Sequence, residues 1–408
     1  LDVARLVDLG MLHKGKLGIR SEVCILPHGD LFIASDFWPQ VTGNAMKDDF
    51  VVGIGLAPIA LENMTVRRKV SSTLDLGTGN GIQALVAASH SASVTGTDIN
   101  GRALAIAGLN ARINGLSNVE FIQGSLFEPV HDRTFDLIVC NPPFVISPAG
   151  SYQYRDSGTR GDGMVENIVR GVGGRLNEGG FFSMLLNWHH QNNRDCFERP
   201  AQWVKDSGCD AFLVCAETYD PVEYAAAWLS KDVSVSGASY PAALDAWLEY
   251  YKKEGIGMIS FGTLVLRKRT GGVNWFMEER TGAGRPSGSC SEQILRIFAA
   301  RDAIENGEDL LTRTLALTAD HELFHTLHAE AGVWKIDTAQ IRQTRGLPFI
   351  GNVDNLMAIV LAGCSGDRTV GQIVDDLSSN LRVPRDRVVQ PCLGVLKMLM
   401  LKGFFEIR

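Results

Sequence analysis

The feature that most constrains this fold is a regular alternation of apolar strands and helical segments between residues 72 and 266. Each strand-like run is continuously apolar, which is typical of parallel strands that are buried on both faces of a sheet. The predicted strands are 73–76, 93–98, 119–123, 135–140, 180–187, 211–216 and 256–266, and the predicted helices are 81–89, 102–114, one around 165–176 and one after residue 194. We therefore predict a doubly wound α/β fold, with a parallel sheet covered by helices on both faces.

The segments outside this alternation predict two further parts of the chain. Residues 1–50 contain a short helical pattern and a hairpin-like pair of strands, which predict a small N-terminal appendage. The α/β domain is predicted over 51–275, because the alternation stops there and a Gly/Pro/Ser-rich linker follows at 282–289. Residues 285–408 predict a C-terminal α+β domain that is partly winged-helix-like. Its 14 Lys/Arg and 15 Asp/Glu favour docking of a substrate or a partner over binding to duplex DNA.

Composition and charge exclude several classes of protein. Hydrophobic residues make up 45% of the chain and charged residues 21%, which is typical of globular proteins. No apolar run reaches the roughly 18 residues that a membrane span needs, and no signal sequence is evident, so we expect a cytoplasmic protein without membrane contacts. The formal charge of −7 argues against non-specific coating of DNA. The eight cysteines are scattered without a CxxC pair, which predicts reduced thiols rather than a zinc ribbon or a disulfide framework.

A glycine-rich turn follows the first predicted strand of the α/β domain. Gly77, Gly79 and Gly81 let the backbone turn sharply and approach a ligand closely. The dinucleotide-binding pattern would need a further glycine at the position of Ile82, so that class of cofactor is disfavoured. Asp98, at the end of the second strand, is placed to accept hydrogen bonds from two ribose hydroxyls. The turn therefore predicts a site for a nucleotide-like cofactor.

This stretch resembles the class I S-adenosylmethionine-dependent methyltransferases, whose first motif is an acidic residue followed by GxGxG. The resemblance implies that Asp75 lies near the sulfonium end of the cofactor and that the three glycines adjoin its methionine and ribose. It also implies that Asp98 binds the ribose and that Ile99 packs on the adenine. The next cofactor position falls on Ser125 and Leu126, where many members carry an Asp against the adenine amine. A serine hydroxyl can accept that hydrogen bond more weakly.

The sequence Asn141-Pro142-Pro143-Phe144 follows the predicted strand 135–140, at the edge of a parallel sheet where ligands bind. The two prolines remove two N–H donors and leave a surplus of acceptors, the side-chain oxygen of Asn141 and the carbonyl of Pro142. Such a pair can accept both N–H bonds of an NH₂ group. The two acceptors can turn the delocalised lone pair of an amide or exocyclic amine toward a methyl group, and stabilise the positive charge that develops on nitrogen. Phe144 can stack on a planar acceptor.

The same tetrapeptide is similar to the NPP(F/Y) motif of methyltransferases that modify glutamine amides in release factors and exocyclic amines of adenine or guanine. The resemblance covers roughly residues 50–270 and implies catalytic roles for Asn141, Pro142 and Phe144. We expect methyl transfer to a planar nitrogen, with a protein glutamine as the acceptor. A nucleobase amine in RNA or DNA, a small amine-bearing metabolite, and a non-catalytic binding protein that keeps the fold remain the alternatives.

Residues 152–163 resemble the RD-x-G-x-x-GDG segment of the glutamine-methylating branch. We expect this segment to act as a lid on the substrate side, with Arg155 and Arg160 as substrate-binding residues. Pro143 is expected to contact the substrate as well. Trp188 completes the expected set, because it ends the fifth predicted strand and faces the same ligand edge.

A second motif, His321-Glu322-Leu323-Phe324-His325, matches the HExxH pattern of zinc proteases. On a helix the two histidines share a face and can chelate a metal, whereas on a strand they lie about 13 Å apart. The flanking sequences are β-like, and the longer metzincin pattern fails because His328 stands where glycine is required. We therefore predict a strand here and no metal site.

Overall fold

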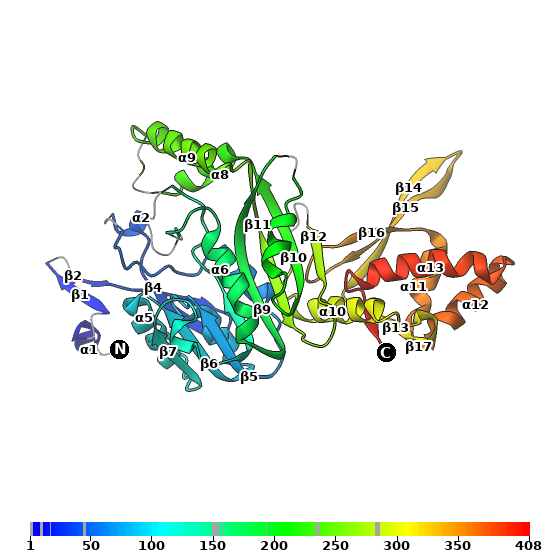
Figure 1. Ribbon diagram of the computed structural model, residues 1–408, viewed down its shortest axis with the longest axis horizontal. Coiled ribbons are helices and arrows are strands. Elements are labelled where there is room, and N and C mark those ends of the chain that lie inside the picture. Colours follow the sequence, from blue (N-terminus) through cyan, green and yellow to red (C-terminus); the bar gives the residue numbers. More distant parts are fainter. Residues whose placement is uncertain are drawn as a thin grey trace. The chain divides into compact units, whose positions relative to one another are not determined.

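The structure is a computed structural model that describes residues 3–8, 11–16, 18–43, 46–148, 155–156, 158–192, 194–232, 235, 237–281 and 286–408 (Figure 1). The chain divides into two compact units, Leu1–Ala283 and Gly284–Arg408. Among the helices of these described residues, none is both long and apolar enough to cross a membrane.

An eight-stranded sheet forms the centre of the first unit, in the order β12-β10-β11-β9-β8-β5-β6-β7. The strands are β5 Val70–Leu76, β6 Ser91–Asp98, β7 Val119–Gln123, β8 Phe135–Cys140, β9 Leu176–His190, β10 Cys209–Tyr219, β11 Met258–Lys268 and β12 Phe276–Arg280. Neighbouring strands from β9 to β7 are parallel, so the predicted doubly wound α/β fold is confirmed. The prediction of a wholly parallel sheet is wrong, because β11 runs antiparallel to both β9 and β10. A continuously apolar run indicates burial on both faces and does not indicate strand direction.

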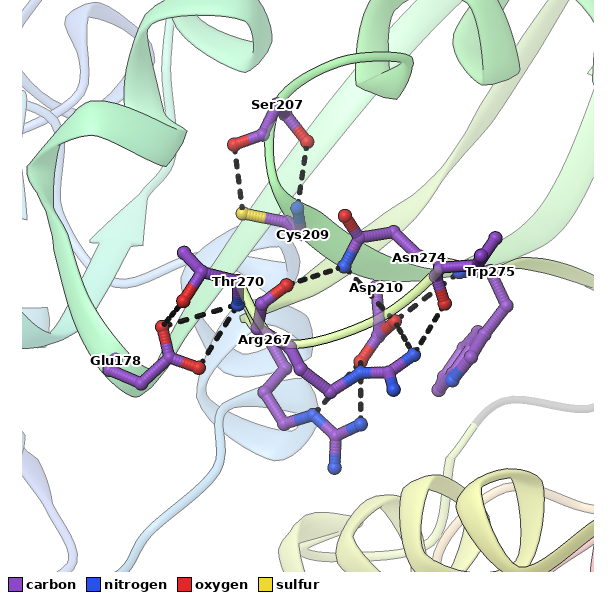
Figure 2. A network of polar contacts seen from close by, with 10 residues as sticks. Glu178, Ser207, Cys209, Asp210, Arg267, Thr270, Asn274 and Trp275 are labelled. Carbon is purple, nitrogen blue, oxygen red and sulfur yellow. Dashed lines mark hydrogen bonds and ion pairs between the residues drawn. The ribbon is translucent and has the colours of Figure 1, made fainter. Parts of the chain in front are cut away.

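Strand β12 forms one edge of the sheet, and our predicted domain ended at residue 275, immediately before it. Asp210, at the start of β10, holds this edge together (Figure 2). Its buried carboxylate accepts hydrogen bonds from Arg267 at 2.5 Å, from Arg269 at 2.7 Å and from the backbone N–H of Trp275 at 3.3 Å. Burial alone would raise the pKa of Asp210, but the two arginines hold that pKa below its usual value. The carboxylate therefore fixes β11 and the start of β12 against β10.

Helices cover both faces of this sheet. They are α3 Leu56–Met64, α4 Ile82–Ala87, α5 Gly101–Ile113, α6 Gly163–Val172, α7 Glu198–Val204, α8 Pro221–Leu229 and α9 Tyr240–Glu254. In α6, Val165, Ile168, Val169 and Val172 lie three or four residues apart, so they share one face of the helix and are buried together. They pack into the main core with residues of β5, β8, β9, β10 and β11. Full burial of each such side chain contributes about 1.5–3 kcal/mol of folding free energy.

The N-terminal part of the chain packs against this α/β core through its second hairpin. It comprises α1 Val3–Asp8, a hairpin of β1 Leu12–Gly15 and β2 Gly18–Ser21, a hairpin of β3 Cys24–His28 and β4 Leu31–Ser35, and the short α2 Pro39–Thr42. Asn110 of α5 binds β4 as a neighbouring strand would. It accepts the N–H of Ala34 at 2.8 Å and donates to the Ala34 carbonyl at 2.9 Å. Ile33 joins a core cluster with residues of α4, so β4 is part of the domain's packing.

The second unit combines helices with two small sheets. Its helices are α10 Ser291–Glu305, α11 Asn355–Gly363, α12 Val370–Leu381 and α13 Arg385–Met400. Its strands are β13 Thr314–Leu317, β14 His321–Glu330, β15 Val333–Gln343, β16 Ile350–Val353, β17 Ser365–Thr369 and β18 Phe405–Ile407, in the orders β17-β13-β18 and β14-β15-β16. The HExxH-like sequence lies on β14, as predicted. Because His321 and His325 are four residues apart on one strand, their separation is about 13 Å.

Candidate active site

The predicted site residues gather at one edge of the sheet. Strands β5, β6 and β8 are parallel neighbours, so their carboxyl ends meet at the same edge. Gly77 follows β5, Asp98 ends β6, and Asn141 follows β8. The fold therefore places the glycine-rich turn, the acidic residue and the NPPF motif on adjacent strands.

The glycine-rich turn has two kinds of glycine. Gly77, Gly79 and Gly81 all have φ in the left-handed region, at 75°, 55° and 89°, where other residues are strained. Open space lies beside Gly77 and Gly79, so these two glycines can face a ligand. A side chain at Gly81 would instead lie 3.0 Å from the Cβ of Ala107, on α5. Gly81 therefore allows α4 to pack closely on α5, and a side chain there would point at Ala107 and Leu85 instead of open space.

Asp75 lies beneath this turn and is buried. One of its carboxylate oxygens accepts a hydrogen bond from the Thr78 hydroxyl at 2.6 Å and from the backbone N–H of Ala84 at 3.0 Å. Burial raises the pKa of Asp75 to about 7, in spite of these hydrogen bonds. These contacts are with the glycine-rich turn and the start of α4, so Asp75 holds the turn in its conformation.

Asp98 is half-buried and connects the turn to the next strand. It accepts the N–H of Gly79 at 2.9 Å and the N–H of Asn100 at 2.9 Å, one at each carboxylate oxygen. Burial raises its pKa, and these two backbone bonds oppose the rise. A carboxylate offers about four acceptor positions, so positions remain for ribose hydroxyls. The side chain of Ile99 next to it is 49% exposed and presents an apolar surface.

Two further predicted cofactor residues follow β7. Ser125 is exposed, and Leu126 is half-buried with φ at 48°, which is unusual for a residue other than glycine. The turn that contains them is tied to β6, because the N–H of Gly124 donates to the carbonyl of Asp98 at 3.0 Å. The open glycines, the Asp98 carboxylate and the apolar Ile99 together fit the ribose and adenine of an adenosyl cofactor.

The NPPF motif contains an unsatisfied acceptor. The side-chain oxygen of Asn141 is buried and has no hydrogen-bond partner among the described residues. Buried polar atoms without partners are rare in folded proteins, and one at a ligand edge is a binding position that a ligand can satisfy. Pro142 is buried, Pro143 is half-buried, and the ring of Phe144 lies 5.8 Å from the ring of Phe261 on β11. The structure thus shows one of the two predicted acceptors, the side-chain oxygen of Asn141, without a partner among the described residues.

Two tyrosines hold the segment that follows the motif. The hydroxyl of Tyr224, on α8, accepts the N–H of Ile146 at 3.2 Å, and the hydroxyl of Tyr251, on α9, donates to the Ile146 carbonyl at 2.9 Å. The side chain of Asn187, on β9, also bonds to the Tyr224 hydroxyl. We did not predict these supporting residues. The alternation of β9 gives a signal for Asn187, because a polar residue lies there between the apolar Leu186 and Trp188.

The structure places the predicted substrate-binding residues differently from our expectation. Trp188 is fully buried in the main core, and its indole N–H, the one polar group of the side chain, donates to the carbonyl of Cys196 at 2.6 Å. Arg155 is buried and forms ion pairs with Asp156 at 2.8 Å and with Asp232 at 3.0 Å. These contacts fix the segment rather than leave the guanidinium for a substrate.

The remaining part of the predicted lid is also anchored. Arg160 is exposed and pairs with Glu254 of α9 at 2.8 Å. Asp162 is buried, pairs with Arg199 at 2.7 Å and accepts the backbone N–H of His189 at 3.1 Å. Residues 152–154 and 157 of the expected lid lie outside the described residues. The part that the structure describes is therefore fastened to α7, α9 and the end of β9.

Comparison with known proteins agrees with this geometry. Residues 57–200 match the family model of the methyltransferase small domain. The chain is 45% identical over 93 residues to a release factor glutamine methyltransferase of Aliivibrio fischeri, covering 22% of this chain and 32% of that protein. It is 30% identical over 191 residues to a ribosomal protein uL3 glutamine methyltransferase of Bradyrhizobium diazoefficiens, covering 43% of this chain and 59% of that protein. The chain thus spans less than two thirds of the length of these relatives.

A solved structure of a ribosomal protein L11 methylase from Lactobacillus delbrueckii subsp. bulgaricus is 24% identical, with a TM-score of 0.28, and covers 38% of this chain and 68% of that one. A superposition this loose carries no weight for activity. The family match, the curated relatives and the site geometry agree on the cofactor and the domain type. The chain therefore carries a class I methyltransferase domain whose cofactor is S-adenosylmethionine.

Proposed function

We propose that this protein methylates the side-chain nitrogen of a glutamine in a protein, with a release factor or a ribosomal protein as the acceptor. The observation that supports this most directly is the buried, unpartnered side-chain oxygen of Asn141 beside the acceptor-rich Pro142. The curated relatives support the choice of acceptor, because their names specify glutamine in a release factor and in ribosomal protein uL3.

One group of site residues binds the cofactor, and a second group binds the acceptor. Bound S-adenosylmethionine supplies an electrophilic methyl group on a sulfur that leaves as a neutral thioether. Asp98 holds ribose hydroxyls, and the open faces of Gly77 and Gly79 allow close approach of the ligand. Asn141 and the carbonyl of Pro142 accept the two N–H bonds of the carboxamide. This turns the nitrogen lone pair toward the methyl carbon and stabilises positive charge on nitrogen as the new C–N bond forms. One N–H proton then leaves to solvent.

Transfer of labelled methyl groups tests the proposed acceptor. The protein is incubated with labelled S-adenosylmethionine and with purified release factor or ribosomal protein uL3, and glutamine methylation is read by mass spectrometry of peptides. We expect label on one glutamine. Label that enters RNA or DNA of a fractionated extract, and not protein, would instead support the nucleobase alternative. Cofactor binding without transfer to any fraction would support a non-catalytic binding protein.

Two variants separate cofactor binding from catalysis. Asn141→Ala is expected to bind S-adenosylmethionine as the wild type does and to lower the turnover rate about 100-fold or more, because it removes an acceptor that acts on the developing charge. Asp98→Ala is expected to abolish cofactor binding, because it removes the ribose acceptor. Calorimetry measures binding in both variants. Equal cofactor affinity in wild type, Asp98→Ala and Asn141→Ala would refute the role of Asp98.

A further inference from the structure

Asn187 is a second buried amide at the ligand edge of the sheet. It lies on β9, the parallel neighbour of β8, three residues after Met184, which pairs with Cys140. It also pairs with Phe261 across β9 and β11, and the Phe261 ring contacts Phe144 of the NPPF motif. Residues that face each other across antiparallel strands share one face of the sheet. Asn187 therefore lies beside Phe261, whose ring contacts Phe144 of the motif.

One end of the Asn187 amide has a partner and the other has none. The NH₂ group of Asn187 donates to the hydroxyl of Tyr224, and its side-chain oxygen is buried without a partner among the described residues. Asn187 is itself only 1% exposed. Its free end is thus in the same state as the side-chain oxygen of Asn141, which ends the neighbouring strand.

The oxygen and nitrogen of an amide have nearly the same shape, so the hydrogen-bond network decides between them, and here it favours the reversed amide with the Asn187 oxygen toward Tyr224. The Tyr224 hydroxyl already accepts the N–H of Ile146, so its own proton needs an acceptor. When the Asn187 oxygen takes this proton, only the Asn187 NH₂ is left without a partner. The orientation with the NH₂ group toward Tyr224 leaves both the hydroxyl proton and the amide oxygen without a partner among the described residues, and each buried unpaired group costs about 1–3 kcal/mol. The group of Asn187 that is free for a ligand is therefore a donor.

A donor here complements the acceptors of the motif. A carboxamide presents an NH₂ group and, on the same carbon, an oxygen that accepts hydrogen bonds. Asn141 and Pro142 can satisfy the NH₂ group but not the oxygen. We propose that Asn187 is a substrate-binding residue whose NH₂ group donates a hydrogen bond to the carboxamide oxygen of the acceptor glutamine. This inference rests on the proposed function and makes the site selective for a nitrogen that has a carbonyl next to it.

Kinetics of two Asn187 variants test this inference. Asn187→Asp keeps an oxygen for Tyr224 and replaces the donor by an acceptor, and Asn187→Ser removes the amide. With release factor as the acceptor, we expect kcat/KM to fall about tenfold or more in both variants, mainly through KM, because a buried carbonyl loses its donor. The dissociation constant of S-adenosylmethionine, from calorimetry, should change less than about twofold.

A matched control is Ser260→Ala. Ser260 is buried on β11, one residue from Phe261, and contacts Thr218 at 2.9 Å and His190 at 3.2 Å. Successive residues of a strand point to opposite faces of the sheet, so the Ser260 side chain lies on the face away from Phe261 and Asn187. The kcat/KM of Ser260→Ala should therefore stay within about twofold of that of the wild type. Unchanged kcat/KM in Asn187→Asp, with methylation by the wild type intact, overturns the inference alone. Absence of methylation by the wild type overturns the proposed function as well.

The wild type provides a second measurement that does not depend on the folding of variants. Two peptide inhibitors are compared, in which the acceptor glutamine is replaced by glutamate methyl ester or by norvaline. The ester keeps the carbonyl that Asn187 would bind, and norvaline lacks it. We expect the ester peptide to inhibit several-fold more strongly, and we expect this preference to disappear in Asn187→Asp. Equal inhibition of the wild type by both peptides would contradict the inference.

Discussion

At the scale of single residues, the buried carboxyl group of Asp75 makes stability depend on pH. Its pKa is about 7 in the folded chain, against 3.8 as the ordinary value. The folded state therefore binds the proton more tightly than the unfolded state, and stability is predicted to fall as pH rises from about 4 to about 7. Besides burial, the charge of Asp98 on β6 raises this pKa. Burial, and after it the charge of Asp75, raises the pKa of Cys140 on β8.

Asp75→Asn tests this dependence. The amide oxygen can still accept the hydrogen bonds of Thr78 and Ala84, but it cannot ionise. We expect the variant to melt at the same temperature as the wild type near pH 4 and several degrees higher near pH 8, because it avoids the ionisation of a buried group. Thermal melts at both pH values provide the measurement. A variant that is less stable than the wild type at pH 8 would show that the ionised form is favoured in the folded protein.

The same residues show what the sequence could and could not predict. The position of Asp98, Asn141 and the turn glycines at one edge of the sheet could be predicted, because each lies at the end of a strand-like run and parallel strands end at one edge. The packing role of Gly81 depends on Ala107, a contact between two helices that the local sequence does not contain. Trp188 was expected at the edge because it ends a strand, but strand alternation turns it into the core.

At the scale of elements, α5 holds the N-terminal hairpin through two asparagines with different burial. Asn110 is buried and bonds to both backbone groups of Ala34 and, at 2.9 Å, to the carbonyl of Asn80 in the glycine-rich turn. Asn114, one helical turn later, makes the same pair of bonds to Phe32, each at 2.8 Å, in a more exposed position. One helix thus connects β4 and the cofactor turn.

Replacing each asparagine by alanine should show how much its burial contributes to the stability of this connection. Asn110→Ala leaves buried backbone groups unpaired and is expected to destabilise the protein by about 3 kcal/mol, since each such group costs about 1–3 kcal/mol. Asn114→Ala is the matched control and should cost less than about 1 kcal/mol, because water can replace its bonds. Urea unfolding measures both. Equal losses in the two variants would mean that burial does not decide the strength of this connection.

Strand direction and edge strands mark the limit of sequence prediction at this scale. The ranges of β7 and β8 were predicted correctly because both are short, rich in apolar residues and bounded by polar turns. The antiparallel direction of β11 was missed, since its apolar run has the same pattern in either direction. Strand β12 was missed because Phe276–Arg280 contains three charged residues, which an edge strand tolerates. Its position depends instead on Asp210 and the arginines that surround it.

At the scale of the whole molecule, each compact unit buries its own core, so the two units should be separable. In the second unit, Ile297, Phe298, Leu396 and Phe404 are at most 1% exposed. All residues proposed to hold the cofactor belong to the first unit, Leu1–Ala283. A chain that ends at Ala283 is therefore expected to bind S-adenosylmethionine with a dissociation constant within about twofold of that of the full chain. Calorimetry on both chains measures this, and a large loss of affinity would show that the cofactor site depends on the second unit.

The same truncated chain tests the docking role that we predict for the second unit. If that unit binds the acceptor protein, its removal should raise KM for release factor about tenfold or more, because the tethered second contact is lost. Methylation of a short glutamine peptide should be unchanged, because a peptide that reaches only the NPPF edge has no second contact to lose. An equal loss of kcat/KM with both substrates would show that the second unit supports the catalytic domain and does not dock the acceptor. Unchanged kinetics with both substrates would exclude docking of this acceptor.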